Sequence, residues 1–133
     1  MEKTRKRPGL SAPYTSNCQV IDSRLRESLE KATSPAEKTE CFDAAHETWE
    51  WLLLQAFHEL LILCQTQQQY ALREAQRLWL LYREQDFACI DDIYSGLENG
   101  FISPETSAAK MEITRSRAMQ LLQLRDKCRE AKP

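Results

Sequence analysis

The 133-residue chain is poor in the residues that interrupt helices. It has only three glycines, and runs of β-branched residues are few. Glycine is among the weakest helix formers, and β-branched residues favour strands. Their scarcity predicts a helical protein, and 133 residues suffice to bury the core of one domain without a metal or cofactor.

An excess of basic charge is also missing. The chain has 18 basic and 20 acidic residues, which leaves a net charge of -2. Proteins that neutralise phosphates need clustered lysine and arginine, so nucleic acid is not expected as a partner. A membrane span is not expected either, because Glu50, Gln55 and Glu59 interrupt the apolar segment between Trp49 and Cys64. This segment is predicted to be a core helix.

Sequence motifs of catalysis and metal binding are absent. The five cysteines form no C-x-x-C pair, and His46 and His58 lie far from any paired cysteines, so no zinc site is expected. No nucleophile elbow, H-E-x-x-H motif or glycine-rich phosphate loop occurs. His46 and Glu50 can meet at i,i+4, which is an ordinary pairing on a helix surface. We therefore expect neither an enzyme nor a bound cofactor.

The amino-terminal segment begins with basic residues but has no apolar region after them. As written, the chain thus has no export signal. Two localisations stay open: a cytoplasmic protein if the chain is complete as written, or an envelope protein whose signal has been removed. Residues 1–16 are predicted to be a flexible basic arm.

Helix starts are well marked in the sequence that follows. A short helix is expected from Asn17 to about Ala32. "TSPAEKTEC" then supplies a cap at Ser34, a proline at the first helical position and Glu37 for a capping box. "ISPETS" repeats the arrangement, with Ser103 as the cap, Pro104 in the first turn and Glu105 placed favourably for the helix dipole.

Two further helix boundaries are predicted from weaker sequence signals. A reversal is expected near Thr66 to Gln69, because a single helix continuing to Tyr94 is too long for a compact domain. The third helix is expected to end where Gly96 and Gly100 occur. The predicted fold is all-α: a small antiparallel up-and-down bundle of three long helices plus a short N-terminal helix. It forms a single domain over residues 17–128, with a frayed end at 129–133.

The stretch "AQRLWLLYREQDFAC" places aromatic and basic side chains at helical intervals. Trp79 and Tyr82 are predicted to be core aromatics. Arg83 is predicted to be partly buried against a carboxylate of the facing helix, with Glu50 or Glu59 as the partner. This pattern indicates helix packing.

Three stretches resemble the LprI-like, lysozyme-inhibitor-type family of small bacterial envelope proteins. "AQRLWLLYRE" is similar to its A-Q-R-x-W signature, "TSPAEKTEC" to its entry into a long helix, and "ITRSRAMQL" to its closing motif. Together they cover residues 31 to about 124. The residues assigned to this structural motif are Arg77, Trp79, Tyr82, Arg83, Thr114 and Arg117.

The resemblance implies a helical, exported, disulfide-braced protein that binds another protein without catalysis. The most specific function that the resemblance implies is that of an inhibitor or immunity protein against lysozyme-type peptidoglycan hydrolases. The chain departs from the family's cysteine positions, with Leu29, Phe87 and Ala109 where cysteines are expected. The remaining bridge that the resemblance implies joins Cys18 to Cys41.

The loop "SGLENGFISPE" is the predicted contact with the partner, with Glu98, Phe101 and Glu105 as its candidate residues. A cytoplasmic helical adaptor or regulatory subunit with no hydrolase target is the alternative. In that case Trp51 and Leu54 on the second helix are expected to form the interface. The oligomeric state and the identity of the partner stay open.

Overall fold

The computed structural model describes residues 14–97 and 103–131, and all regular structure within these ranges is helical. The helices are α1 (Tyr14–Lys31), α2 (Pro35–Leu63), α3 (Thr66–Leu97) and α4 (Pro104–Ala131). The predicted all-α class is therefore confirmed. α1 begins before the predicted start at Asn17, and α4 continues through part of the segment that was expected to fray.

α2 begins with the predicted cap. The hydroxyl of Ser34 accepts the backbone N–H of Glu37 at 3.1 Å, and Pro35 occupies the first turn. The carboxylate of Glu37 in turn accepts the backbone N–H and the hydroxyl of Thr33 at 2.7 and 3.0 Å. These bonds lower the pKa of Glu37, because they stabilise its charged form. Two of the N–H groups exposed at the start of the helix are thus satisfied.

The chain reverses between α2 and α3 at Cys64 and Gln65, earlier than the predicted Thr66–Gln69. The side-chain amide of Gln69 donates to the carbonyl oxygens of Leu61 and Cys64, at 2.9 and 3.3 Å. A neighbouring glutamine side chain accepts the backbone N–H of Gln65 at 2.8 Å. Glutamine side chains therefore satisfy the groups at this turn, where glycine or proline more often appears.

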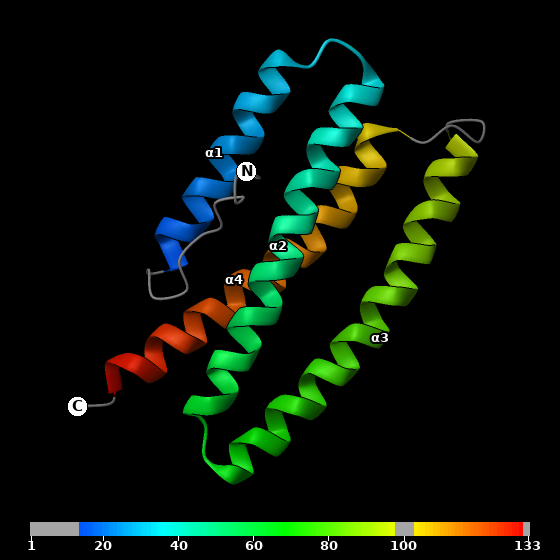
Figure 1. Cartoon of the computed structure of the whole chain (residues 1–133). Coiled ribbons are helices and arrows are strands. Elements are labelled where there is room, and N and C mark those ends of the chain that lie inside the picture. Colours follow the sequence, from blue (N-terminus) through cyan, green and yellow to red (C-terminus); the bar gives the residue numbers. More distant parts are fainter. Residues whose placement is uncertain (1–13, 98–102, 132–133) are drawn as a thin grey trace, which may run out of the picture.

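The apolar core lies between α2 and α4, with α1 covering one side (Figure 1). Apolar side chains that are fully or almost fully buried come from α2 and α4, with two more from α1. They are Cys18, Ile21, Ala45, Trp49, Leu52, Leu53, Ala56, Leu60, Met111, Ala118, Leu121 and Leu122. Removal of this surface from water is the main force that holds α1, α2 and α4 together.

α3 stands apart from this core along much of its length (Figure 1). Gln76 is its buried residue, and Leu72 and Trp79 pack against the core only in part. Tyr82, which was predicted to be a core aromatic, is 55% exposed, so that prediction is wrong. Leu78 on the same helix is 51% exposed. The regular three-helix bundle is therefore not confirmed, because α3 contacts the other helices along a narrow line.

Candidate functional site

Arg83 joins α3 to both neighbouring long helices. Its guanidinium donates to the two carboxylate oxygens of Glu50 on α2, at 2.5 and 3.1 Å. It also donates to the hydroxyl of Thr114 on α4 at 3.1 Å. Of the two carboxylates proposed from the sequence, Glu50 is thus the partner. A two-point contact of this kind suits the planar fork of arginine and is not available to lysine.

Thr114 and His46 extend this contact into the interior. Thr114 is fully buried, and its hydroxyl lies 2.8 Å from Nε2 of His46. Burial lowers the pKa of His46, and Arg83 lowers it further, while nearby Glu50 opposes them. A neutral imidazole can accept the proton of Thr114 while Arg83 donates to the same oxygen. His46 is therefore part of an interior network, and its separation from Glu50 is 3.9 Å.

Trp79 lies between two arginines. The guanidinium carbon of Arg83 is 4.8 Å from the ring centroid, and that of Arg117 is 5.8 Å away. Arg117 also donates to the side-chain oxygens of Gln76 and Gln120, at 3.0 and 2.5 Å. The cation–π contact of Arg117 with Trp79 and its hydrogen bond to Gln76 thus join α4 to α3 at this level.

We call this set the polar network. It comprises His46, Glu50, Gln76, Trp79, Arg83, Thr114 and Arg117. The structure brings four of the predicted motif residues together in it but leaves Arg77 and Tyr82 outside. Arg77 pairs with Glu74 at 2.7 Å on the exposed side of α3, and the hydroxyl of Tyr82 donates to Asp86 at 3.1 Å. Sequence reasoning missed Gln76, although its spacing to Trp79 places both on one helix face.

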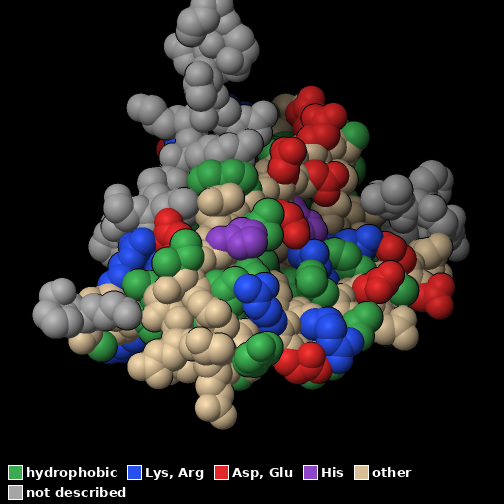
Figure 2. Space-filling model, turned by 60° about the horizontal axis from the view of Figure 1, so that its bottom comes forward, with side chains coloured by type: hydrophobic (Ala, Val, Ile, Leu, Met, Phe, Trp, Pro, Cys, Tyr) green, Lys and Arg blue, Asp and Glu red, His purple; other side chains and the backbone are tan. Residues whose placement is uncertain are grey.

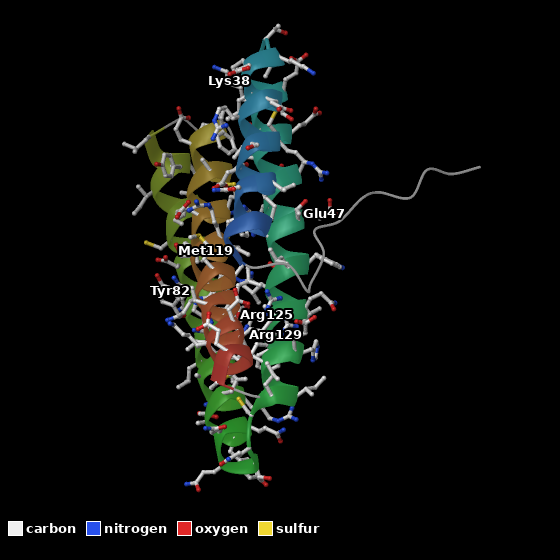
Figure 3. The ribbon with its side chains drawn as sticks, turned by 90° about the vertical axis from the view of Figure 1, so that its left-hand side faces the viewer. Lys38, Glu47, Tyr82, Met119, Arg125 and Arg129 are labelled. Carbon is white, nitrogen blue, oxygen red and sulfur yellow. The ribbon has the colours of Figure 1, made fainter. Side chains whose placement is uncertain are left out.

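A second ionic cluster ties α4 to the lower half of α2. The guanidinium of Arg125 is completely buried and lies 3.3 Å from Glu59 and 3.0 Å from Asp126. Arg129 also reaches Glu59, at 2.6 Å. Figure 3 shows Arg125 and Arg129 extending from α4 in the direction of α2. Glu59, the other carboxylate proposed for Arg83, is therefore engaged here.

The upper part of α2 carries a shallow groove of about 520 Å³, which we call the α2 acidic groove. It is lined by Asp43, His46, Glu47, Glu50, Trp51 and Leu54. Asp43 and Glu47 are exposed, and Leu54 is 50% exposed. α2 as a whole has six carboxylates and one lysine. Figure 2 shows acidic side chains gathered near the top of that view. The groove therefore combines negative charge with an apolar floor.

A second open groove of about 550 Å³ lies between α3 and α4. Trp79, Tyr82, Ile113 and Arg117 line it together with small and polar side chains, and Glu112 is the carboxylate among its lining residues. Within residues 14–97 and 103–131, no three His, Cys, Asp or Glu side chains gather as metal ligands. None of the helices described above is long and apolar enough to cross a bilayer.

The Cys18–Cys41 bridge implied by the resemblance is not formed. In the α1–α2 hairpin, Cys18 lies about 20 Å from the turn along the helix axis and Cys41 only about 9 Å. The resulting axial offset of roughly 10 Å exceeds the Cα separation that a disulfide spans. Burial raises the pKa of the Cys18 thiol to about 11.

The predicted partner-binding residues fall at the junction of α3 and α4. Glu98 and Phe101 lie outside the described residues. Glu105 is exposed in the first turn of α4, where its charge suits the helix dipole. Their role in partner binding stays a prediction.

These features define a class of protein: an all-helical scaffold held together by an interior polar network, with a charged outer groove. A family model described as lysozyme inhibitor LprI matches residues 16–121. The chain therefore belongs to the LprI family, as the three sequence motifs had indicated. No curated protein matches the chain, and no solved structure does so either.

Proposed function

We propose that this protein inhibits a lysozyme-type peptidoglycan hydrolase by binding it, without catalysing a reaction. The description of its family names lysozyme inhibition. The α2 acidic groove is the observation that carries the proposal, because lysozyme-type enzymes are often cationic. A negative surface attracts such a partner and speeds its docking.

The groove has the composition of a protein contact. Trp51 is half-buried at its floor and Leu54 lies exposed beside it, so both can lose further surface to a partner. Tryptophan residues are frequent among the side chains that dominate binding energy. Asp43 and Glu47 surround them with exposed carboxylates. The imidazole of His46 does not offset these charges at neutral pH, because burial lowers its pKa.

A non-catalytic role agrees with how the titratable groups are used. The imidazole of His46 is 2.8 Å from the Thr114 hydroxyl, and Glu50 is held by Arg83. Nε2 of His46 faces the buried Thr114 hydroxyl, so this nitrogen is not available as a base for a ligand in the groove. These residues support the scaffold and leave binding to their exposed neighbours.

The test is inhibition of a cationic lysozyme by the purified protein and two charge-reversal variants. Asp43→Lys with Glu47→Lys is expected to weaken inhibition about tenfold at low salt, since each lost rim pair contributes about 1 kcal/mol or less. Glu27→Lys with Glu30→Lys makes the same charge change on α1, where both glutamates are exposed, and should alter inhibition far less. Wild-type protein without inhibitory effect, or equal losses in both double variants, contradicts the proposal.

The predicted loop contact is a second part of this proposal. Replacing Glu98, Phe101 and Glu105 together by alanine is expected to reduce inhibition if the loop enters the hydrolase cleft. Glu105 is exposed and belongs to neither ionic cluster described above, so its replacement should cost no more than about 1 kcal/mol, through the lost interaction with the helix dipole. Unchanged inhibition by this variant removes the loop from the contact and leaves the α2 acidic groove alone.

A further inference from the structure

α3 presents a second apolar surface to solvent, on the face that adjoins the polar network at the α3–α4 groove. We call it the outer stripe: Ala71, Ala75, Leu78, Tyr82, Cys89 and Ile93, all exposed. The first four recur at alternating intervals of four and three, which is the spacing of a coiled-coil seam. Leu78, Tyr82 and Ile93 are each more than half exposed. Soluble monomers rarely leave so long an apolar surface uncovered.

The spacing of the stripe specifies the shape of what covers it. A seam with coiled-coil periodicity fits another long helix. The side chains of that helix enter the holes between the side chains of the seam. From Ala71 to Ile93 the stripe extends about 33 Å along the axis. α3 itself, with 32 residues, is long enough to cover it completely.

Charges beside the stripe indicate which helix this is. Arg117 lies in the α3–α4 groove next to Tyr82, and its guanidinium donates to the side-chain amides of Gln76 and Gln120. No carboxylate in the described part of the chain pairs with it, and burial lowers its pKa. Asp86, on the same edge of the stripe, accepts the Tyr82 hydroxyl, and no cation of the described residues pairs with it. The surface thus offers one unpaired charge of each sign.

We infer that a second copy of this chain covers the outer stripe, with the two α3 helices antiparallel. When Leu78 faces Tyr82 of the second copy, Asp86 of that copy is level with Glu74. Arg117 donates to Gln76, which is two residues from Glu74 along α3. Asp86 of the second copy and Arg117 of the first are therefore within about 3 Å of each other along the helix axis. Two-fold symmetry forms this pair twice. Parallel helices would instead separate Asp86 from Arg117 by about 15 Å.

The interface leaves the α2 acidic groove accessible. Figure 3 shows Tyr82 at the outer edge of α3, on the opposite side of the molecule from Glu47 of the α2 acidic groove. A dimer formed through α3 therefore keeps both acidic grooves open. The inference is independent of the proposed function, because self-association can be measured without any hydrolase.

Sedimentation equilibrium of the full chain tests the interface. The wild-type protein is expected to have twice the chain mass of 15.5 kDa. Leu78→Glu with Tyr82→Glu should be monomeric, with dimerisation weakened at least a hundredfold and the helical circular dichroism unchanged. Ile62→Glu is the matched control, because Ile62 is 80% exposed on α2, away from the stripe. A wild-type monomer up to about 1 mM, or equal weakening by the control, overturns the inference.

A charge exchange tests the antiparallel register. Asp86→Arg and Arg117→Asp are each expected to weaken dimerisation about tenfold, and the double variant should recover most of the loss, since the pair is restored with reversed signs. A double variant that dimerises no better than the single variants contradicts the register. Oxidation of the wild type with diamide should give no disulfide between the two Cys89 thiols. If that bridge forms rapidly, the helices are parallel and the assigned arrangement is wrong.

Discussion

Replacing Thr114 by valine removes one hydroxyl from the polar network and keeps the shape of the side chain. Thr114 is fully buried, so no water replaces the oxygen that Arg83 and His46 share at 3.1 and 2.8 Å. Each lost bond costs about 1 kcal/mol, and the extra buried methyl offsets part of this sum. Arg83 keeps Glu50, and the His46 side chain is 21% exposed, which limits the penalty. We expect a net loss of about 1–2 kcal/mol in the free energy of unfolding.

Thermal and urea unfolding of the purified protein measure this loss. For 133 residues, an unfolding entropy of about 2.1 cal/mol/K per residue converts it to a fall in Tm of about 4–7 °C. The control is Thr48→Val, because the Thr48 hydroxyl donates only to the backbone carbonyl of Ala44 at 3.2 Å. This variant should change stability by about 0.5 kcal/mol or less. Equal effects of the two substitutions would refute the interior network as a source of stability.

Three further predictions concern titration, thiols and the second ionic cluster. Burial lowers the pKa of His46 in the folded protein below its unfolded value of about 6.5, so the unfolded state binds more protons in acid. The contribution of neutral His46 to the free energy of unfolding is therefore complete above about pH 6.5 and falls below it. The urea midpoint should fall less between pH 7.5 and 5 in His46→Gln than in the control His58→Gln, and equal slopes would exclude His46 as the cause. Cys18 and Cys41 should stay separate thiols, so alkylation of unfolded, unreduced protein should modify all five cysteines, and mass spectrometry showing fewer adducts would indicate a bridge. Arg125→Met should cost about 2 kcal/mol, because it removes a fully buried guanidinium from the half-buried Glu59 and Asp126 while Glu59 keeps Arg129, and an unchanged Tm would show that these ion pairs contribute nothing net.

The helix boundaries that could be predicted are those with local side-chain chemistry. Ser34 and Ser103 precede prolines, and both cap their helices in the structure. The apolar segment between Trp49 and Cys64 was also correctly predicted to be a core helix, and Trp49, Leu52 and Ala56 are buried there. The turn at Cys64 was misplaced, since it depends on glutamine side chains that have no strong preference for turns.

The candidate site was predicted only in part, for two physical reasons. The apolar pattern of α3 has two faces, and periodicity cannot tell which one the chain itself covers, so Tyr82 was placed in the core although it is 55% exposed. The contact of His46 with Thr114 joins residues 68 positions apart, and no local pattern reports such a pairing. The Arg83–Glu50 pair was anticipated because a helix hairpin restricts the carboxylates that can face a buried guanidinium.

The positions of the family motif residues separate the scaffold from the binding surfaces. Arg83 and Thr114 face inward and fasten α3 to α2 and α4, so they offer little surface to a partner. The proposed recognition uses outward side chains, such as Asp43 in the α2 acidic groove. Substitutions in the network should therefore change inhibition only in proportion to lost folding stability. Substitutions of groove residues outside the network, such as Asp43 and Glu47, should change inhibition at constant Tm. Network variants that abolish inhibition while Tm stays unchanged would place the contact at the motif itself.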